Sequence, residues 1–240
     1  MESGIGNAES RVENLSKGER TRQAILESAV NIASTEGLEG LSIGRLAIDL
    51  SMSKSGLFAH FGSKQDLQLA TLDAARSIFI REVVLPSLEA GPGIQLLWRL
   101  CEMWFDYLGR EVFRGGCFFV AAASEFDGRP GRVHDRIGEI MKEWLDGIEG
   151  RIREAQQLKH IDEDLDPEQL AFEINAIEMG SNLAFQLFKD EHAVERGRHG
   201  VLERLRSRAT KLGLSLLTST SPIKQSTITR IKQARAGPKA

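Results

Sequence analysis

The chain has 240 residues, of which 41% are hydrophobic and 27% are charged, and its formal net charge is −3. This composition is typical of globular proteins and excludes disordered and collagen-like chains as classes. No apolar run approaches the roughly 18 residues that a membrane-spanning helix needs, and the polar first twenty residues lack the apolar segment of a secretory signal. We therefore expect a cytoplasmic protein that makes no contact with a membrane.

Charge is distributed unevenly along the chain. Residues 1–65 are almost neutral, residues 66–195 hold 13 basic and 25 acidic side chains, and residues 196–240 hold 11 basic and 1 acidic side chain. The opposite signs of the last two segments indicate different partners at different places. Residues 1–16 are predicted to be a flexible N-terminus, and residues 218–240, rich in Ser, Thr and Lys, a disordered basic tail.

Periodic apolar residues predict helices throughout, and no hairpin signal interrupts them, so the expected fold class is all-α. Ser16 and Glu19 have the spacing of a capping box at the start of a first helix that ends near Gly37. Ser42 and Ser53 can each cap a short helix. A long connecting helix is predicted over residues 63–90, ending at the Gly-Pro-Gly breaker that follows.

The second half of the chain predicts a helical bundle. A clean amphipathic helix covers residues 94–108, an apolar helix starts near Cys117, and a longer helix follows from Val133 to Ile152. Two final helices are expected at 167–189 and 193–217. The domains are thus a three-helix unit over residues 17–66 and a helical domain over residues 67–217, joined by the connecting helix.

Residues 41–64 have the spacing of a helix-turn-helix, with a small polar face at the start of the second helix. Such a helix fits the major groove of DNA. Ser53, Lys54 and Ser55 place donors at its N-terminus, where the helix dipole favours phosphates and base edges. Gly56 allows close approach, and His60 and Lys64 are spaced to contact the flanking phosphates.

The run from Leu57 to Lys64, Leu-Phe-Ala-His-Phe-Gly-Ser-Lys, closely resembles the DNA-binding hallmark of the TetR family of bacterial transcriptional regulators. The strong resemblance covers residues 17–70. It implies these DNA-contacting residues: Ser42, Arg45, Ser53, Lys54, Ser55, Gly56, Phe58, His60 and Lys64. The chain departs from the family pattern in having Phe58 for the usual Tyr, Ser51 for the usual turn Gly, and Gly44 at an often polar position.

The same resemblance implies that the second domain binds a small molecule and forms a homodimer through its last two helices. An apolar or amphipathic effector would then release the protein from a near-palindromic operator, which makes repression the expected mode. Aromatic residues and one methionine are rich enough here to line an apolar cavity. The candidate ligand-binding residues are Trp98, Trp104, Phe105, Phe118, Phe119, Met141, Trp144 and Phe172.

Other classes of function have less support in the sequence. The common catalytic motifs are absent, no His stands at a metal-ligand spacing from the acids at 162–166, and neither an enzyme nor a cofactor or metal site is expected. Cys101 and Cys117 are interpreted as inert thiols, with redox sensing left open. A non-specific chromosome-structuring protein and a TetR-like activator remain alternatives. The operator, the regulated genes and the effector are not encoded in any motif.

Overall fold

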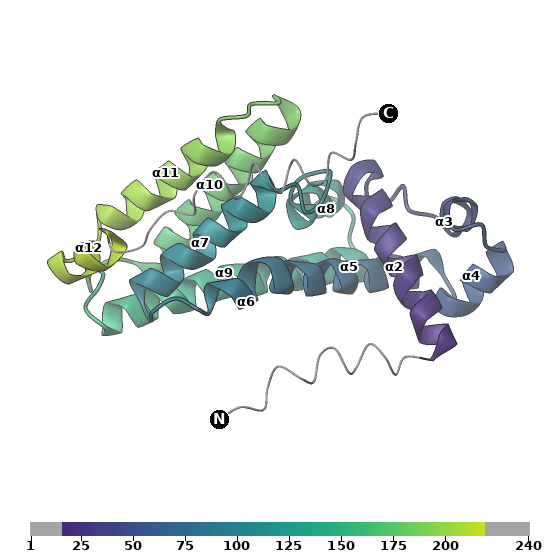
Figure 1. Cartoon of the computed structure of the whole chain (residues 1–240), viewed down its shortest axis with the longest axis horizontal. Helices are drawn as coiled ribbons and strands as arrows, with labels where there is room; N and C mark the ends of the chain where they lie inside the picture. The colour runs from purple at the N-terminus through teal and green to yellow at the C-terminus, as the bar shows by residue number, and fades with distance from the viewer. Residues whose placement is uncertain (1–15, 219–240) are drawn as a thin grey trace, which may run out of the picture.

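The computed structural model describes residues 16–218, and its regular structure is helical (Figure 1). The helices follow in this order: α2 (Lys17–Glu36), α3 (Ile43–Asp49), α4 (Lys54–Phe61), α5 (Lys64–Phe79), the π-helical turn η1 (Ile80–Val84), α6 (Leu85–Ser87), α7 (Ile94–Gly109), α8 (Phe118–Phe126), α9 (Arg132–Gln157), α10 (Pro167–Leu187), α11 (Ala193–Arg206) and α12 (Lys211–Thr218). Within the described residues the only strand-like pairing is one bridge between Ile161 and Ala209. The predicted all-α class is confirmed. The two predicted tails lie outside the described residues, except for Ser16 and Thr218.

Serine caps start the helices of the N-terminal unit. Ser16 and Glu19 form the predicted capping box, with Glu19 N donating to Ser16 Oγ at 3.2 Å and Ser16 N donating to Glu19 Oε2 at 2.8 Å. Ser42, Ser53 and Ser63 cap α3, α4 and α5 by accepting the backbone N–H three residues later. Each cap pairs an N–H that the first turn of a helix leaves free. These local bonds explain why the four predicted helix starts are confirmed.

The turn between α3 and α4 places Ser51 in the left-handed region, with φ of 51°. Met52 N donates to Ala47 O at 2.9 Å and closes the turn. A residue other than Gly costs on the order of 1 kcal/mol in this conformation. Leu46 and Leu57 are fully buried on either side, and each contributes about 1.5–3 kcal/mol by leaving water. Packing therefore outweighs the strain at Ser51.

The connecting helix contains a π-helical turn that the sequence did not predict. The chain passes from α5 through η1 into α6, and Leu85 N donates to Ile80 O, five residues earlier. Pro86 lacks an N–H, and its ring conflicts with the carbonyl four residues before it in a regular helix. The wider turn relieves this conflict. It also brings Ile80 and Val84 to the wall of an internal cavity.

Helix α7 forms the centre of the larger domain, as its amphipathic pattern predicts. It packs against α9, α11 and η1, and α5 and α9 lie side by side along the long axis of the molecule (Figure 1). Almost every residue from Ile94 to Leu108 is buried. The acids in this helix are paired, with Glu102 3.5 Å from Arg99 and Asp106 2.7 Å from Arg198.

The last helix is not continuous over 193–217, so this expectation was wrong. The chain leaves helical conformation after α11 because residues 208 and 210 bond to another segment. Asp162 N donates to Arg208 O at 3.0 Å, and Thr210 N donates to His160 O at 3.0 Å. Helix α12 then restarts in a new direction. Leu212, near the start of α12, is exposed.

Candidate nucleic-acid interface and internal cavity

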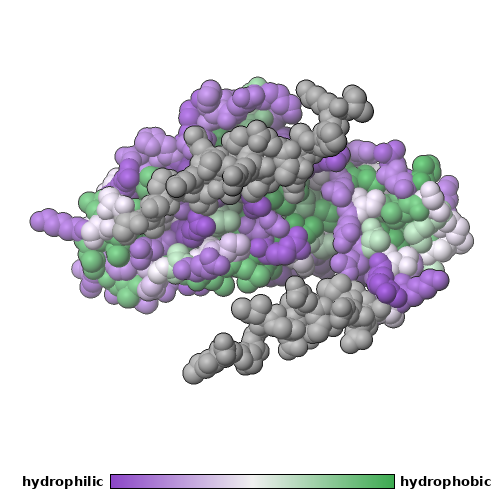
Figure 2. All heavy atoms as spheres, in the orientation of Figure 1, coloured by the Kyte–Doolittle hydropathy of each residue, from purple (hydrophilic) through white to green (hydrophobic). Residues whose placement is uncertain are grey.

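Helices α3 and α4 form one end of the molecule, away from the bundle (Figure 1). The polar N-terminus of α4 is exposed there, with Ser53, Lys54 and Ser55 all open to solvent. Apolar residues are exposed at the same end, among them Ile48 and Phe58, which retain 74% and 52% of their accessible area (Figure 2). A surface with free donors beside exposed apolar groups can contact both phosphates and base edges.

Lys54 is an unpaired cation on this surface. Among the residues that the structure describes, it makes no hydrogen bond and no ion pair. Its side chain crosses over Gly44, where a Cβ would lie 3.6 Å from Lys54 Cε. Ile43, Gly44, Lys54, Ser55, Phe58 and Ala59 line a shallow hollow between α3 and α4. The small residue at position 44 therefore gives the lysine room to lie across the two helices.

Two other predicted contact residues are already engaged. Arg45 Nη2 lies 3.1 Å from Glu36 Oε1, and its Nε lies 3.7 Å from Asp49 Oδ2. Lys64 Nζ donates to Glu39 at 2.7 Å through both the carboxylate and the backbone carbonyl. Ser42, Ser53 and Gly56 take part in the helix caps. His60 packs its ring near Phe61, 6.3 Å between centroids.

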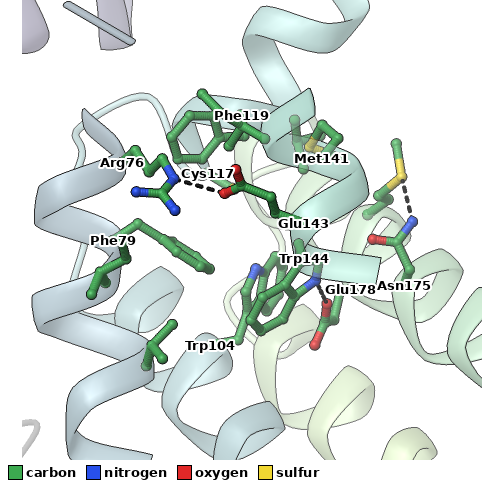
Figure 3. A pocket seen from close by; sticks show the side chains of 15 residues that line it. Arg76, Phe79, Trp104, Cys117, Phe119, Met141, Glu143, Trp144, Asn175 and Glu178 are labelled. Carbon is green, nitrogen blue, oxygen red and sulfur yellow. Dashed lines mark hydrogen bonds and ion pairs between the residues drawn. The ribbon is translucent and has the colours of Figure 1, made fainter. Parts of the chain in front are cut away.

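A cavity of about 340 Å³ lies within the larger domain (Figure 3). It is framed by α5 with η1, α7, α9 and α10, together with the start of α8. Its lining consists of Arg76, Phe79, Ile80, Val84, Trp104, Cys117, Phe119, Val120, Ile140, Met141, Glu143, Trp144, Asn175, Glu178 and Met179. The volume falls in the range of small-molecule sites, about 300–1,000 Å³.

Four of the eight candidate ligand-binding residues line this cavity: Trp104, Phe119, Met141 and Trp144. The placement of the other four differs from expectation. Trp98, Phe105 and Phe118 are buried in core packing elsewhere, with Phe105 against Trp104 and under Arg198, and Phe118 against Phe113. Phe172 is 64% exposed because it lies on the outer face of α10.

The sequence analysis missed three residues of charged type that line the cavity, Arg76, Glu143 and Glu178. Glu178 of α10 is fully buried, and its Oε2 accepts from Trp144 Nε1 at 3.1 Å. Its Oε1 has no hydrogen-bond partner among the described residues. Burial raises the pKa of Glu178 to about 8, and the bond from Trp144 opposes this only in part. Glu178 follows Leu170 and Ile174 at four-residue spacing, so it lies on the same buried face of α10. This spacing could have indicated its burial from the sequence.

The remaining polar groups of the lining are paired with one another. Arg76 Nε donates to Glu143 Oε2 at 2.8 Å, and both side chains are partly exposed, at the mouth of the cavity (Figure 3). Asn175 Nδ2 donates to Met179 Sδ at 3.4 Å. Burial raises the pKa of the Cys117 thiol, as it does for Cys101. Both cysteines are thus kept as neutral thiols, which disfavours redox sensing.

Helix α8 connects the cavity to the N-terminal unit. Phe119 and Val120 line the cavity, and one helix turn further on the carboxylate of Glu125 accepts from Leu38 N at 2.7 Å and Glu39 N at 2.9 Å. Glu39 in turn holds Lys64. The two units also touch at Gly115, where a Cβ would lie only 1.5 Å from Ser34 O. A short run of direct contacts therefore links the cavity wall with the start of α5.

Within residues 16–218, no group of His, Cys, Asp or Glu has the arrangement of a metal site. Over the same part of the chain, no helix is long and apolar enough to span a bilayer.

Comparison with protein families identifies two matches. A sequence model described as "Bacterial regulatory proteins, tetR family" matches residues 25–71, and one described as "Tetracyclin repressor-like, C-terminal domain" matches residues 93–201. Together they cover more than half of the chain. A search of curated proteins by sequence found no match.

Solved structures with the same fold are numerous. A TetR transcriptional regulator from Chloroflexus aurantiacus superimposes with a TM-score of 0.76 at 20% identity, covering 81% of this chain and 98% of that chain. A putative transcriptional regulator from Saccharomonospora viridis, solved in complex with choline, superimposes with a TM-score of 0.69 at 21% identity, covering 80% of this chain and 99% of that chain. AibR, solved with isovaleryl coenzyme A and operator DNA, superimposes with a TM-score of 0.58 at 21% identity, covering 75% of this chain and 94% of that chain. At these identities the likeness shows the fold.

Proposed function

The chain belongs to the TetR family of bacterial transcriptional regulators, and from this premise we propose that it is a repressor released from a near-palindromic operator by a small apolar or amphipathic molecule. The observation that carries the proposal is the exposed, serine-capped N-terminus of α4 with its unpaired Lys54. An unpaired cation beside the exposed hydroxyls of Ser53 and Ser55, which bond to each other, suits the major groove. An enzymatic role has no support in the cavity, where the one buried carboxyl group, that of Glu178, is hydrogen-bonded to the indole of Trp144.

We assign base reading to Lys54, Ser55 and Gly56, because they form the first turn of α4. Contacts with the DNA backbone fall to Ser42, Arg45, Ser53, Phe58, His60 and Lys64. Phe58 can make an apolar contact with the backbone sugars but lacks the hydroxyl that a tyrosine would offer to a phosphate. Arg45 and Lys64 must exchange a carboxylate for a phosphate, so each contributes less to affinity than an unpaired cation does.

The homodimer is supported by an apolar stripe on the outer face of α10. Phe172, Leu183 and Leu187 are spaced along this helix with about half to two-thirds of their area exposed, and Phe188 follows directly after it. An exposed patch of this kind marks a protein interface. We therefore propose that α10 and α11 of two copies pack together, and that Phe172 serves the dimer rather than the ligand cavity.

An effector in the cavity can act on the DNA-binding unit through α8 and through the connecting helix. A ligand that displaces Phe119 shifts α8, and with it the Glu125 carboxylate that holds the backbone of residues 38 and 39. A ligand that presses on η1 acts on α5 directly. Either movement changes the separation of the two recognition helices, which must match about 34–36 Å, one turn of DNA. By linkage, ligand and operator then weaken each other's binding equally.

The first experiment is selection of bound duplexes from a random pool at physiological salt. Enrichment of a near-palindrome is the expected result, and sedimentation at micromolar concentration is expected to give a dimer. Salt-sensitive binding without enrichment would instead support the non-specific, chromosome-structuring alternative. If the enriched site binds only when a ligand is present, the ligand promotes DNA binding instead of releasing the protein.

A further inference from the structure

We propose that the cavity binds a lipophilic organic cation, with the carboxylate of Glu178 as counter-ion and the rings of Phe79, Trp104, Phe119 and Trp144 as walls. This proposal rests on the cavity being the effector site of the proposed function, and it names the chemical class of the effector. The experiment below separates the two ideas, because it measures binding without DNA.

The first support is the charge of the lining. Three ionisable side chains could carry charge there, and two of them, Arg76 and Glu143, neutralise each other at the mouth of the cavity. Glu178 lies deep in the fold without a basic partner, and its Oε1 is unpaired within the described part of the chain. A buried carboxylate is costly unless a positive charge or hydrogen-bond donors meet it. The protein supplies one donor, the Nε1–H of Trp144, to Oε2 of this carboxylate. Oε1 is left for a ligand to meet.

The second support is the arrangement of the rings. Phe79 meets Trp144 edge to face with 5.2 Å between centroids at 85°, and meets Phe119 at 5.9 Å and 87°. Rings set at right angles form the corner of a cage rather than a flat slot, and Trp104 adds a further wall (Figure 3). The faces of aromatic rings attract alkylammonium groups. The remaining lining is largely aliphatic and suits the apolar part of such a molecule.

The proton balance of binding follows from the groups around Glu178. Burial keeps its carboxyl group protonated at neutral pH when no ligand is bound, since its pKa is about 8. The titratable groups that face it are Cys101 of α7 and Cys117 before α8, both neutral thiols, while α9 presents the indole N–H of Trp144. None of these supplies a positive charge. A bound cation therefore replaces the carboxyl proton, and one proton is released to solvent.

This exchange predicts a distinctive pH dependence. A quaternary ammonium ligand keeps its charge at every pH, so only Glu178 titrates. Below the pKa of Glu178 the affinity for such a ligand rises about tenfold per pH unit, and it levels off above pH 8. An uncharged ligand of the same shape binds without this rise.

The test uses benzyltrimethylammonium and neopentylbenzene, its uncharged isostere in which carbon replaces nitrogen. Binding to the full-length protein is followed by the fluorescence of its three tryptophans and by calorimetry, between pH 6 and pH 9. At pH 8.5 we expect the cation to bind at least tenfold more tightly than the isostere. Calorimetry in two buffers of different ionisation heat is expected to report release of one proton at pH 7.

Glu178→Gln keeps the shape of the side chain and removes the charge. In this variant we expect the affinity for the cation to fall at least tenfold and its pH dependence to disappear, while the isostere binds as before. Glu191→Gln is the matched control, because Glu191 is an exposed glutamate outside the cavity lining, and we expect a change of no more than about threefold. Equal binding of the two probes, an unchanged affinity in Glu178→Gln, or no binding of the cation at 10 mM overturns the proposal.

The same ligand separates this proposal from the proposed function. If the cation binds with the expected charge dependence but leaves operator affinity unchanged, the cation site stands and the effector role fails. If operator binding is confirmed but the two probes bind equally, the regulator stands and the cation site fails.

Discussion

The DNA-binding end and the cavity treat their polar groups in opposite ways. At the start of α4, the chain exposes the unpaired Lys54 between Ser53 and Ser55, and Gly56 follows directly in the sequence. In the cavity a single carboxyl group, Glu178, is sealed among rings from four different helices. Water supports the first arrangement, since exposed charges need no partner. Burial keeps the carboxyl group of the second neutral, because buried charge without a partner is unfavourable.

The comparison teaches that the two regions depend on different levels of structure. The α3–α4 surface is held by caps and a turn within about twenty residues. The cavity exists only when α5, α7, α9 and α10 are assembled, and the contacts at Gly115 and Glu125 join it to the other region. Variants at the junction, the surface and the cavity should therefore have separable effects.

The largest effect is expected at the junction. In Gly115→Ala the new Cβ would meet the backbone oxygen of Ser34, which cannot move aside as a side chain can. We expect the free energy of unfolding to fall by about 2–4 kcal/mol, measured by urea denaturation. In the control Gly150→Ala, a Cβ meets nothing within 4 Å on an exposed helix, and we expect a gain of about 0.5–1 kcal/mol. Equal stabilities for the two variants would show that the units do not pack closely there.

At the surface, Lys54→Ala should weaken operator binding by about 1–3 kcal/mol and relax sequence preference. Lys64→Ala should weaken operator and random DNA alike and reduce the dependence on salt. The ion pair of Lys64 with Glu39, worth about 0–1 kcal/mol in an exposed pair, competes with the phosphate and makes the effect of Lys64→Ala smaller. Fluorescence anisotropy on both duplexes at several salt concentrations measures these changes. Parallel losses for Lys54→Ala on both duplexes would argue against base reading.

In the cavity, Glu178 should make stability depend on pH. Its pKa is about 8 in the folded protein and 4.5 in a model peptide, so the folded state retains a proton that the unfolded state has lost. Stability should therefore fall as pH rises from about 4.5 to 8. Glu178→Gln should remove this fall and be more stable than the parent protein by about 1–3 kcal/mol at pH 8. Thermal denaturation at several pH values tests it, and an identical pH profile would mean that Glu178 is solvated.

The smallest effect is expected for Glu125→Gln, which replaces the carboxylate that accepts from Leu38 N and Glu39 N. An amide oxygen can accept only one of these two bonds well, so helix α8 should hold the DNA-binding unit less firmly. We expect DNA affinity to change little and the effect of ligand on it to drop by about 0.5–1 kcal/mol. Operator titrations with and without ligand measure this coupling. An unchanged ligand effect would place the route in η1 and α5 instead.

Much of the N-terminal unit was predictable because its determinants are local. The serines at positions 16, 42, 53 and 63 start helices through bonds to residues three positions away. The resemblance to the TetR family pointed to the turn at Ser51, which the structure has in the left-handed region. The amphipathic stripe of α7 likewise predicts that the helix is buried. The stripe does not indicate which other helix packs against each side of α7. Trp98 and Phe105 were therefore expected at the cavity although they pack elsewhere.

What the sequence determined by itself was the all-α class, the helix starts and the helix-turn-helix, since these rest on contacts between near neighbours. The tertiary structure decided the break between α11 and α12, the outward position of Phe172 and the buried position of Glu178. Each of these depends on residues far apart in the chain: the break, for example, is made by bonds to residues 160–162. Burial is a property of the assembled helices, and no pattern within one helix can specify its partner.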